Sequence, residues 1–235
     1  MSLSGIVICF STELNMNRSL GTFTDGEHWV KVNHFTKKGM DITGVIHVGT
    51  NDWFEYDQYL KMGIEHLLGF EPLQEPIRRF RDKHPDIKSP IIYNVALGNE
   101  DDFKEINVAY GDQQCSSFYN LTEEYRKDYP EFHNVGKEAV RVMKFTTWVK
   151  LYPEIDLSLY NCLVVDVEGF ELEVLKGMGP YLEGFTMLNI ECSGKKRYDV
   201  GPLAPEIITF LAGKGFVQDS PIEDYNDIFF IRRDQ

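Results

Sequence analysis

The sequence predicts an α/β domain built around a largely parallel sheet. The first observation is a rhythm of buried apolar runs that alternate with amphipathic segments between residues 42 and 95. The second is that acidic residues end such runs, as Glu71 and Asp166 do. Strands that alternate with helices pair in parallel through right-handed crossovers, and ligands of such sheets bind beyond the carboxyl ends of the strands. We therefore expect a binding cleft where these acids lie.

The first half of the chain shows the alternation most clearly. Apolar runs predict strands over residues 42–48, 65–70 and 90–95. Apolar residues at helical spacing predict helices over residues 54–62 and 74–83. Gly63 and Pro85 follow these helices and end them. A further helix over about residues 27–38, with Asp25 as its N-cap, is expected within an N-terminal extension of residues 1–40.

The second half resumes the alternation after an interruption. Strands are expected over residues 163–167 and 187–191, and helices over residues 170–176 and 204–212. Residues 216–218 and 227–231 are expected to close the sheet as an antiparallel hairpin. Because no repeat, low-complexity segment or linker divides the chain, residues 41–235 are expected to form one domain.

The interruption is an insertion at about residues 103–145. Residues 103–109 and 139–145 alternate in polarity like an exposed antiparallel pair of strands. Residues 110–137 between them form a long polar loop with many aromatic residues, and loops of this length are usually functional or disordered. Aromatic rings stack well on sugars, which favours a mobile substrate lid that stands apart from the cofactor site. Packing against the edge of the sheet explains the same residues equally well.

Composition narrows the class of partner. The net charge of −13 argues against nucleic acid, which is bound through Lys and Arg. No apolar stretch approaches the roughly 18 residues of a membrane span, and the opening residues lack the basic region of a signal peptide, so the cytoplasm is the expected compartment. The four cysteines form no CxxC pair and the six histidines no HExxH motif, so no metal site is expected.

Two strand ends suggest a nucleotide-like ligand. The run VIHVGTND ends in Gly49, which allows the backbone to turn tightly against a ligand, but it lacks the GxGxxG and GKS or GKT patterns that cradle phosphates. Glu71, in GFEP, follows about twenty residues later, where an acid commonly accepts hydrogen bonds from ribose hydroxyls. A surface acid at the start of a helix is the alternative for Glu71.

A third strand end carries two acids in the motif DVEG. Asp166 and Glu168 are two residues apart on an extended segment, so both side chains lean the same way. One such acid can serve as a general base or a polar anchor, and capping of the next helix is the alternative. Glu191 ends the following strand in the same row, where it is either functional or a paired structural acid.

The motifs VGTND, GFEP, NVALG, CSSF, DVEGFELEVLKG and NIEC, in this order, resemble the FkbM family of S-adenosylmethionine-dependent methyltransferases over residues 44–230. The resemblance implies the class I methyltransferase (Rossmann-like) fold, a seven-stranded, mostly parallel sheet with helices on both faces. It also implies an O-methyltransferase that uses S-adenosylmethionine and acts on a hydroxyl of a sugar, glycan or related small metabolite.

The resemblance also implies a set of cofactor-binding residues. These are His47, Gly49, Asn51, Glu71, Pro72, Asn94, Ala96, Ser117 and Asp166. Gly49 and Asn51 would lie against the methionine part of the cofactor, Glu71 would hold the ribose, and residues 94–96 would flank the adenine. Asp166 and Glu168 would face the methyl-transfer site, with Asp166 as base or orienting group. His133, in the insertion, is a further catalytic candidate.

Two positions depart from the family pattern D-x-G-x-N-x-G. His47 stands where the acid is usual and Trp53 where the second glycine is usual. A neutral His47 is able to bond to the amino or carboxylate end of the cofactor, or it is a satisfied strand-end histidine. Trp53 either lines the pocket or packs in the core. These departures favour an alternative, a binding protein that kept the fold and lost catalysis, while the missing phosphate loop weakens a nucleotide-sugar enzyme.

Overall fold

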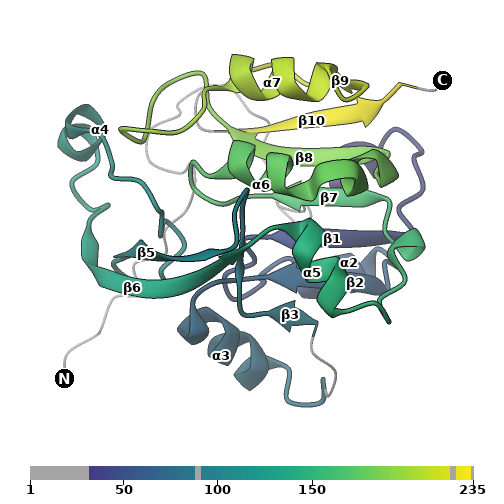
Figure 1. Cartoon of the computed structure of the whole chain (residues 1–235), viewed down its shortest axis with the longest axis horizontal. Helices are drawn as coiled ribbons and strands as arrows, with labels where there is room; N and C mark the ends of the chain where they lie inside the picture. The colour runs from purple at the N-terminus through teal and green to yellow at the C-terminus, as the bar shows by residue number, and fades with distance from the viewer. Residues whose placement is uncertain (1–31, 88–90, 223–225, 234–235) are drawn as a thin grey trace, which may run out of the picture.

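The computed structural model describes residues 32–87, 91–222 and 226–233 of the chain. Figure 1 shows a twisted sheet with helices packed around it and, on the left, an antiparallel ribbon that extends away from the sheet. The main sheet has seven strands in the order β3-β2-β1-β7-β8-β10-β9, and a smaller sheet has three in the order β4-β6-β5.

The main sheet is mostly parallel. Its strands are β1 (Gly44–Val48), β2 (His66–Phe70), β3 (Ile92–Tyr93), β7 (Cys162–Val165), β8 (Met187–Cys192), β9 (Phe216–Gln218) and β10 (Asn226–Arg232). The first five pair in parallel, whereas β10 is antiparallel to both β8 and β9. Every residue of β1 and β7 is buried, as in central strands covered on both faces. The expected fold class and the closing hairpin are confirmed.

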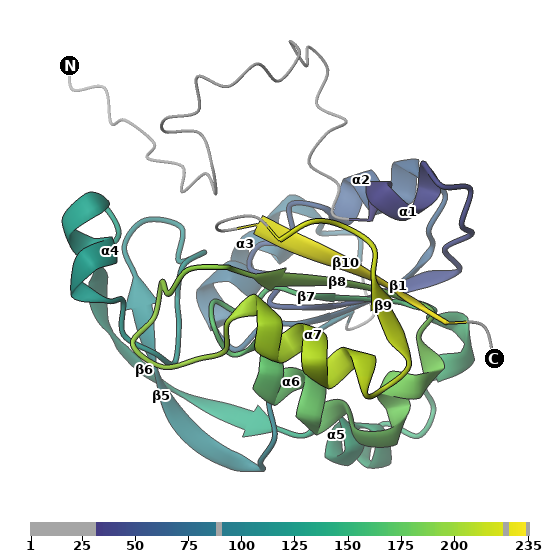
Figure 2. The same cartoon turned by 90° about the horizontal axis from the view of Figure 1, so that it is seen from above.

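Helices cover both faces of this sheet. They are α1 (Asn33–Thr36), α2 (Tyr56–Lys61), α3 (Gln74–Lys83), α5 (Phe145–Leu151), α6 (Glu171–Met178) and α7 (Ala204–Ala212). A further helix, α4 (Glu123–Asp128), lies beside the ribbon instead (Figure 1). One core cluster contains Tyr59 of α2 and Phe80 of α3, and the other contains Val174 of α6 and Leu211 of α7. Figure 2 shows the two groups on opposite sides of the strands. No helix of the described residues is long and apolar enough to cross a membrane.

The third expected strand and the end of the insertion differ from the prediction. Residues 90–95 were expected as one strand, but the chain leaves the main sheet after β3 and β4 (Ala96–Leu97) pairs with β6 in the smaller sheet. The strand expected over residues 139–145 ends at Met143, because α5 begins at Phe145. Phe145 and Trp148, three residues apart on this helix, are both buried and stack on each other, with ring centroids 5.5 Å apart.

The insertion is a long antiparallel ribbon rather than a pair of strands around a structureless loop. Its strands are β5 (Asp102–Ala109) and β6 (Asn134–Met143). The segment expected as a loop contains helix α4, whose N-cap Thr122 accepts a hydrogen bond from the backbone N–H of Tyr125. The residues Thr122, Glu123 and Glu124 carry this helix signal in the sequence, but the helix has only six residues.

The N-terminal extension is only partly described. The helix expected over residues 27–38 corresponds to α1, and the residues before Val32, including Asp25, lie outside the described residues. Phe35 of α1 is fully buried in the core cluster shared by α2 and α3. This short helix therefore packs on the same face of the sheet as those two helices.

Candidate active site

A cavity opens at the carboxyl ends of β1, β2 and β7. We call it the strand-end cavity; it encloses about 530 Å³, part of it open to solvent. Gly49 and Asn51 line it after β1, Glu71 and Pro72 line it after β2, and Ala96 of β4 lines it from the side. These five residues come from three separate parts of the sequence, and the parallel sheet brings them together because its strands end at one edge.

Gly49 allows the close approach of two strand ends. Its φ of 84° lies in the left-handed region, and a Cβ atom at this position would lie 1.8 Å from the backbone oxygen of Asp166. No other residue fits both the backbone conformation and the space. The turn after β1 consequently lies directly against the end of β7.

Glu71 is an almost fully buried acid, with 6% of its surface exposed. Its Oε2 accepts a hydrogen bond from the backbone N–H of Asn51 at 2.9 Å, and its Oε1 accepts one from that of Leu73 at 2.8 Å. Burial raises the pKa of Glu71 to about 7, and these two hydrogen bonds act in the opposite direction. Each carboxylate oxygen keeps further lone-pair capacity for a ligand donor in the cavity.

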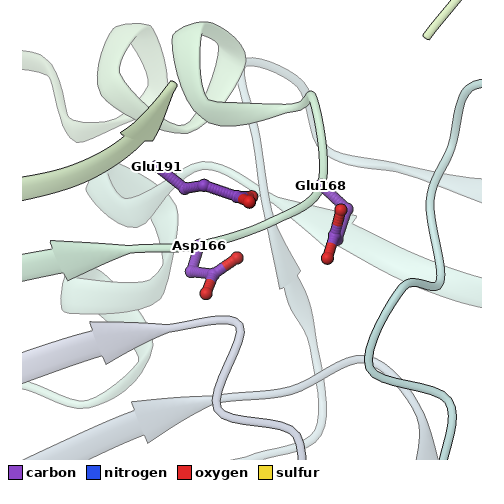
Figure 3. A group of neighbouring side chains, drawn as sticks. All are labelled: Asp166, Glu168 and Glu191. Atoms are coloured by element: carbon purple, nitrogen blue, oxygen red, sulfur yellow. The ribbon is translucent and has the colours of Figure 1, made fainter. Parts of the chain in front are cut away.

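Three acids gather where the strand-end cavity meets the end of β8. Asp166, Glu168 and Glu191 each place a carboxylate oxygen within 4.8 Å of the others. Figure 3 shows the three side chains extending from neighbouring strand ends into one region. Nη1 of Arg197 lies 2.6 Å from Glu168 and 3.3 Å from Glu191, so one guanidinium group partly neutralises two of these acids.

The surroundings of Glu168 and Glu191 favour the protonated forms of these two acids to different degrees. Burial raises the pKa of Glu168, and the neighbouring Arg197 acts against this shift. Burial, together with the carboxylates of Asp166 and Glu168, raises the pKa of Glu191 well above its usual range. The hydroxyl of Tyr198 donates a second hydrogen bond to Glu168. Glu168 is therefore held by two fixed partners.

A second cavity lies on the other side of this group, and we call it the Arg197 cavity. Glu191, Arg197 and Tyr198 line it, together with Gly169 and Glu171 at the start of α6. Asp166 and Glu168 line the strand-end cavity, whereas Glu191 lines the Arg197 cavity. The acids thus stand between two spaces, an arrangement that suits a reaction between two bound molecules.

Residues 45–217 match the family model described as the methyltransferase FkbM domain. The chain belongs to the FkbM methyltransferase family. The family expected from the motifs is confirmed, and with it the class of S-adenosylmethionine-dependent methyltransferases. No curated protein matches the chain.

Two solved structures align with this FkbM family member. One is magnesium protoporphyrin IX methyltransferase from Synechocystis PCC 6803 with bound S-adenosylmethionine, at 12% identity and a TM-score of 0.41, covering 86% of this chain and 76% of that chain. The other is a putative S-adenosylmethionine-dependent methyltransferase from Listeria monocytogenes, at 11% identity and a TM-score of 0.42, covering 87% of this chain and 98% of that chain.

The two residues that depart from the FkbM pattern lie in the core. His47 is 1% exposed and its Nδ1 lies 3.3 Å from the hydroxyl of Tyr59. Its neighbours Ile46 and Val48 belong to the core cluster of the opposite face, because successive strand residues point to opposite sides. Trp53, also 1% exposed, packs edge-on to the His47 ring. Neither residue lines the strand-end cavity.

Three other expected site residues also lie outside both cavities of the described chain. Asn94 donates its Nδ2 hydrogen bonds to the backbone oxygens of Glu71 and Pro72, so it holds the end of β2. Ser117 is buried and donates to the backbone oxygen of Glu168 at 2.6 Å. His133 is exposed on the ribbon and stacks on Tyr110, with ring centroids 4.9 Å apart.

The ribbon contributes residues to the strand-end cavity, and the sequence interpretation missed two of them, Gln113 and Gln114. Gln113, Gln114, Ser116 and Phe118 line the strand-end cavity beside Glu71. The expectation that this segment stands apart from the expected cofactor residues is therefore wrong. Arg197 and Tyr198 were also missed, since nothing in the local sequence KKRY shows that it returns to the end of β7.

Proposed function

We propose that the chain is an O-methyltransferase that acts on a hydroxyl group of a sugar, glycan or related small metabolite. The observation that carries this proposal is the acid group formed by Asp166, Glu168 and Glu191 between the strand-end cavity and the Arg197 cavity. In this proposal the cofactor occupies the strand-end cavity and the acceptor occupies the Arg197 cavity.

The lining of the strand-end cavity fits S-adenosylmethionine. Gly49 lines the cavity with backbone atoms alone, and the Glu71 carboxylate accepts hydrogen bonds from the ribose hydroxyls. Apolar side chains, among them Pro72, Ala96 and Phe118, provide a surface for the adenine ring.

The acids differ in their suitability as the general base for the acceptor hydroxyl. Bound S-adenosylmethionine would supply an electrophilic methyl group. Asp166 orients the acceptor hydroxyl and takes its proton as the oxygen attacks, a role that requires hydrogen-bond reach to that oxygen. Glu168 is a weaker candidate for the base because Arg197 and Tyr198 already hold its carboxylate. His133 takes no part, since it lines neither cavity.

The alternative, a binding protein without catalysis, has less to support it than the methyltransferase proposal. That alternative rested on His47 and Trp53, which pack against each other beneath α2 and leave the strand-end cavity to the other residues. We therefore carry only the methyltransferase proposal to a test.

Titration calorimetry with S-adenosylhomocysteine tests the cofactor half of the proposal. Glu71→Ala removes two charge-assisted hydrogen bonds to the ribose, worth about 1.5–3 kcal/mol each, so we expect at least a tenfold loss of affinity. Glu75→Ala, which removes a half-exposed acid one turn along α3, should bind as the wild type does. Thermal melts of both variants establish that they are folded.

A panel of sugars, glycans and small alcohols, incubated with labelled S-adenosylmethionine, tests the acceptor half. Methyl transfer to a hydroxyl group of one of these compounds is the expected result. A wild-type protein that fails to bind S-adenosylhomocysteine, or label recovered on nitrogen or carbon of the preferred acceptor, would contradict the proposal.

A further inference from the structure

The side chain of Gln113 is the most unusual polar group of the strand-end cavity. Its Oε1 atom is buried and has no hydrogen-bond partner among the described residues, although the residue itself lines the cavity. A buried amide oxygen without a hydrogen-bond donor is unfavourable. Native proteins rarely contain one unless a ligand or a water molecule supplies the donor. Gln113 therefore carries an unpartnered amide oxygen at the wall of the strand-end cavity.

The backbone of Gln113 is strained in the same way as two other residues of the cavity. Among the described residues, the non-glycine positions with positive φ are Asn51, Trp53, Gln113 and Glu168. Three of these four line the strand-end cavity, and φ is 68° at Gln113. Such strain concentrates at binding and catalytic sites, where the surrounding structure holds it in place.

Hydrogen bonds on both sides of Gln113 fix it next to Glu71. The backbone oxygen of the preceding residue, Asp112, accepts a hydrogen bond from Nδ2 of Asn51 at 3.1 Å, and the backbone N–H of Asn51 donates to Glu71. The hydroxyl of Ser116 donates to the backbone oxygen of Gln113 at 2.7 Å. The segment around Gln113 is thus tied to the residue that contacts the Glu71 carboxylate.

We infer that Oε1 of Gln113 accepts a hydrogen bond from a ribose hydroxyl of the bound cofactor, beside Glu71. This inference rests on the proposed function. The ribose hydroxyls are the donors that the proposed pose brings to the Glu71 end of the cavity, and an amide oxygen accepts such a bond without adding charge. Gln113 then makes the inserted ribbon a direct part of cofactor recognition.

Calorimetry with S-adenosylhomocysteine tests the assignment. Gln113→Leu keeps most of the side-chain volume and removes the acceptor, and we expect roughly tenfold weaker binding, or about 1.4 kcal/mol. Gln58→Leu is the matched control, because Oε1 of Gln58 on α2 is also buried without a partner but lies outside the strand-end cavity. The control variant should bind as tightly as the wild type.

Gln113→Asn serves as a second variant in case the leucine variant fails to fold. Asparagine tolerates the left-handed backbone, but its shorter side chain withdraws the amide oxygen from the cavity. It should lose affinity in the same direction as Gln113→Leu.

The 2′-deoxy and 3′-deoxy forms of S-adenosylhomocysteine identify the group that Gln113 contacts. For one of these analogues, the wild type and Gln113→Leu should bind equally, since the donor is already missing. Unchanged binding of S-adenosylhomocysteine by both Gln113 variants would overturn the inference while leaving the proposed function intact. An equal loss with all three ligands would overturn the assignment to the ribose, and a wild type that binds none of them would overturn both proposals.

Discussion

Glu168, two residues after Asp166, is held in place by several contacts. The carboxylate of Glu168 is fixed by Arg197 and Tyr198, and its backbone oxygen accepts a hydrogen bond from Ser117. Its φ of 55° places it in the left-handed region, which side chains rarely adopt. These constraints suit a residue that shapes the site, and they leave Asp166 as the better candidate for proton transfer.

Asp166→Asn should slow methyl transfer far more than it weakens cofactor binding. The amide keeps the size of the side chain but is unable to accept a proton, and loss of a general base typically lowers rates by about 10²–10⁴-fold. Single-turnover rates with a methylated acceptor from the panel measure the effect, and calorimetry with S-adenosylhomocysteine measures binding.

Asp86→Asn is the control for this prediction. Asp86 is an exposed acid in the turn after α3 and lines neither cavity, so its variant should react at the wild-type rate. A loss of less than about threefold in Asp166→Asn would assign Asp166 a structural role.

The positions of single site residues could be predicted only for residues that directly follow a strand of the parallel sheet. Gly49, Glu71 and Asp166 follow strands, and parallel strands end at one edge, so their proximity could be predicted. His47 lies within a strand that is buried on both faces. The alternation of polarity that tells one face from the other is absent there, and the sequence could not show that His47 points away from the cavity.

At the scale of elements, the ribbon has two parts, one that lines the strand-end cavity and one that packs against residues of the Arg197 cavity. The loop after β5 lines the strand-end cavity. Helix α4 packs elsewhere, since Tyr125 is buried in a cluster with Leu121 and Tyr198. The Arg197 guanidinium lies 5.6 Å from the centre of the Tyr125 ring. The two parts should therefore affect two different binding steps.

Replacing residues 111–118 by a short glycine-containing turn should lower the affinity for S-adenosylhomocysteine at least tenfold, because a wall of the strand-end cavity is lost. Converting residues 123–128 to a Gly-Ser segment of equal length should leave that affinity within about threefold. The second change should instead reduce methyl transfer, because Tyr198 and Arg197 lose their packing against α4.

Calorimetry and transfer assays on both variants measure these effects. Equal losses of cofactor binding in the two variants would show that the ribbon acts as one structural unit, without the division of roles described above.

The sequence predicted the bounds of several elements well but missed two short helices. The bounds of α3, α7 and β9 agree with the expected ranges. Helices α4 and α5 were missed because six or seven residues hold too little periodicity to stand out against a strand pattern. The loop between β5 and α4 could not be placed either, since its position depends on contacts with Asn51 that are distant in sequence.

At the scale of the whole molecule, several buried acids make the stability of the fold depend on pH. Burial raises the pKa of Glu71 to about 7 and that of Glu171 to about 7. In the unfolded chain both ionise near their ordinary value of 4.5. Between these values the folded protein binds more protons than the unfolded chain, so stability decreases as pH rises.

The free energy of unfolding of the ligand-free protein should therefore fall between about pH 5 and pH 7.5. Each of the two acids contributes a loss on the order of 3 kcal/mol at most, at about 1.4 kcal/mol per pKa unit. Asp101 and Asp219 have lowered pKa values and titrate below this window, so they do not offset the loss. Urea unfolding at several pH values measures the trend.

Glu71→Gln is the test variant for this trend, because it removes one of the two titrations. The difference in the free energy of unfolding, variant minus wild type, should shift in favour of the variant between pH 5 and pH 7.5. A wild type whose stability rises through this window, or a variant with the same pH dependence as the wild type, would contradict the prediction.

The inserted ribbon has a practical consequence for engineering. An insertion between elements of the main sheet is the natural segment to exchange when a new acceptor specificity is wanted, because loops tolerate variation better than the sheet does. In this protein the same segment supplies Gln113, Ser116 and Phe118 to the strand-end cavity. A chimera that replaced the whole ribbon would therefore give the strand-end cavity a foreign wall, whereas a graft limited to α4 would leave that wall unchanged.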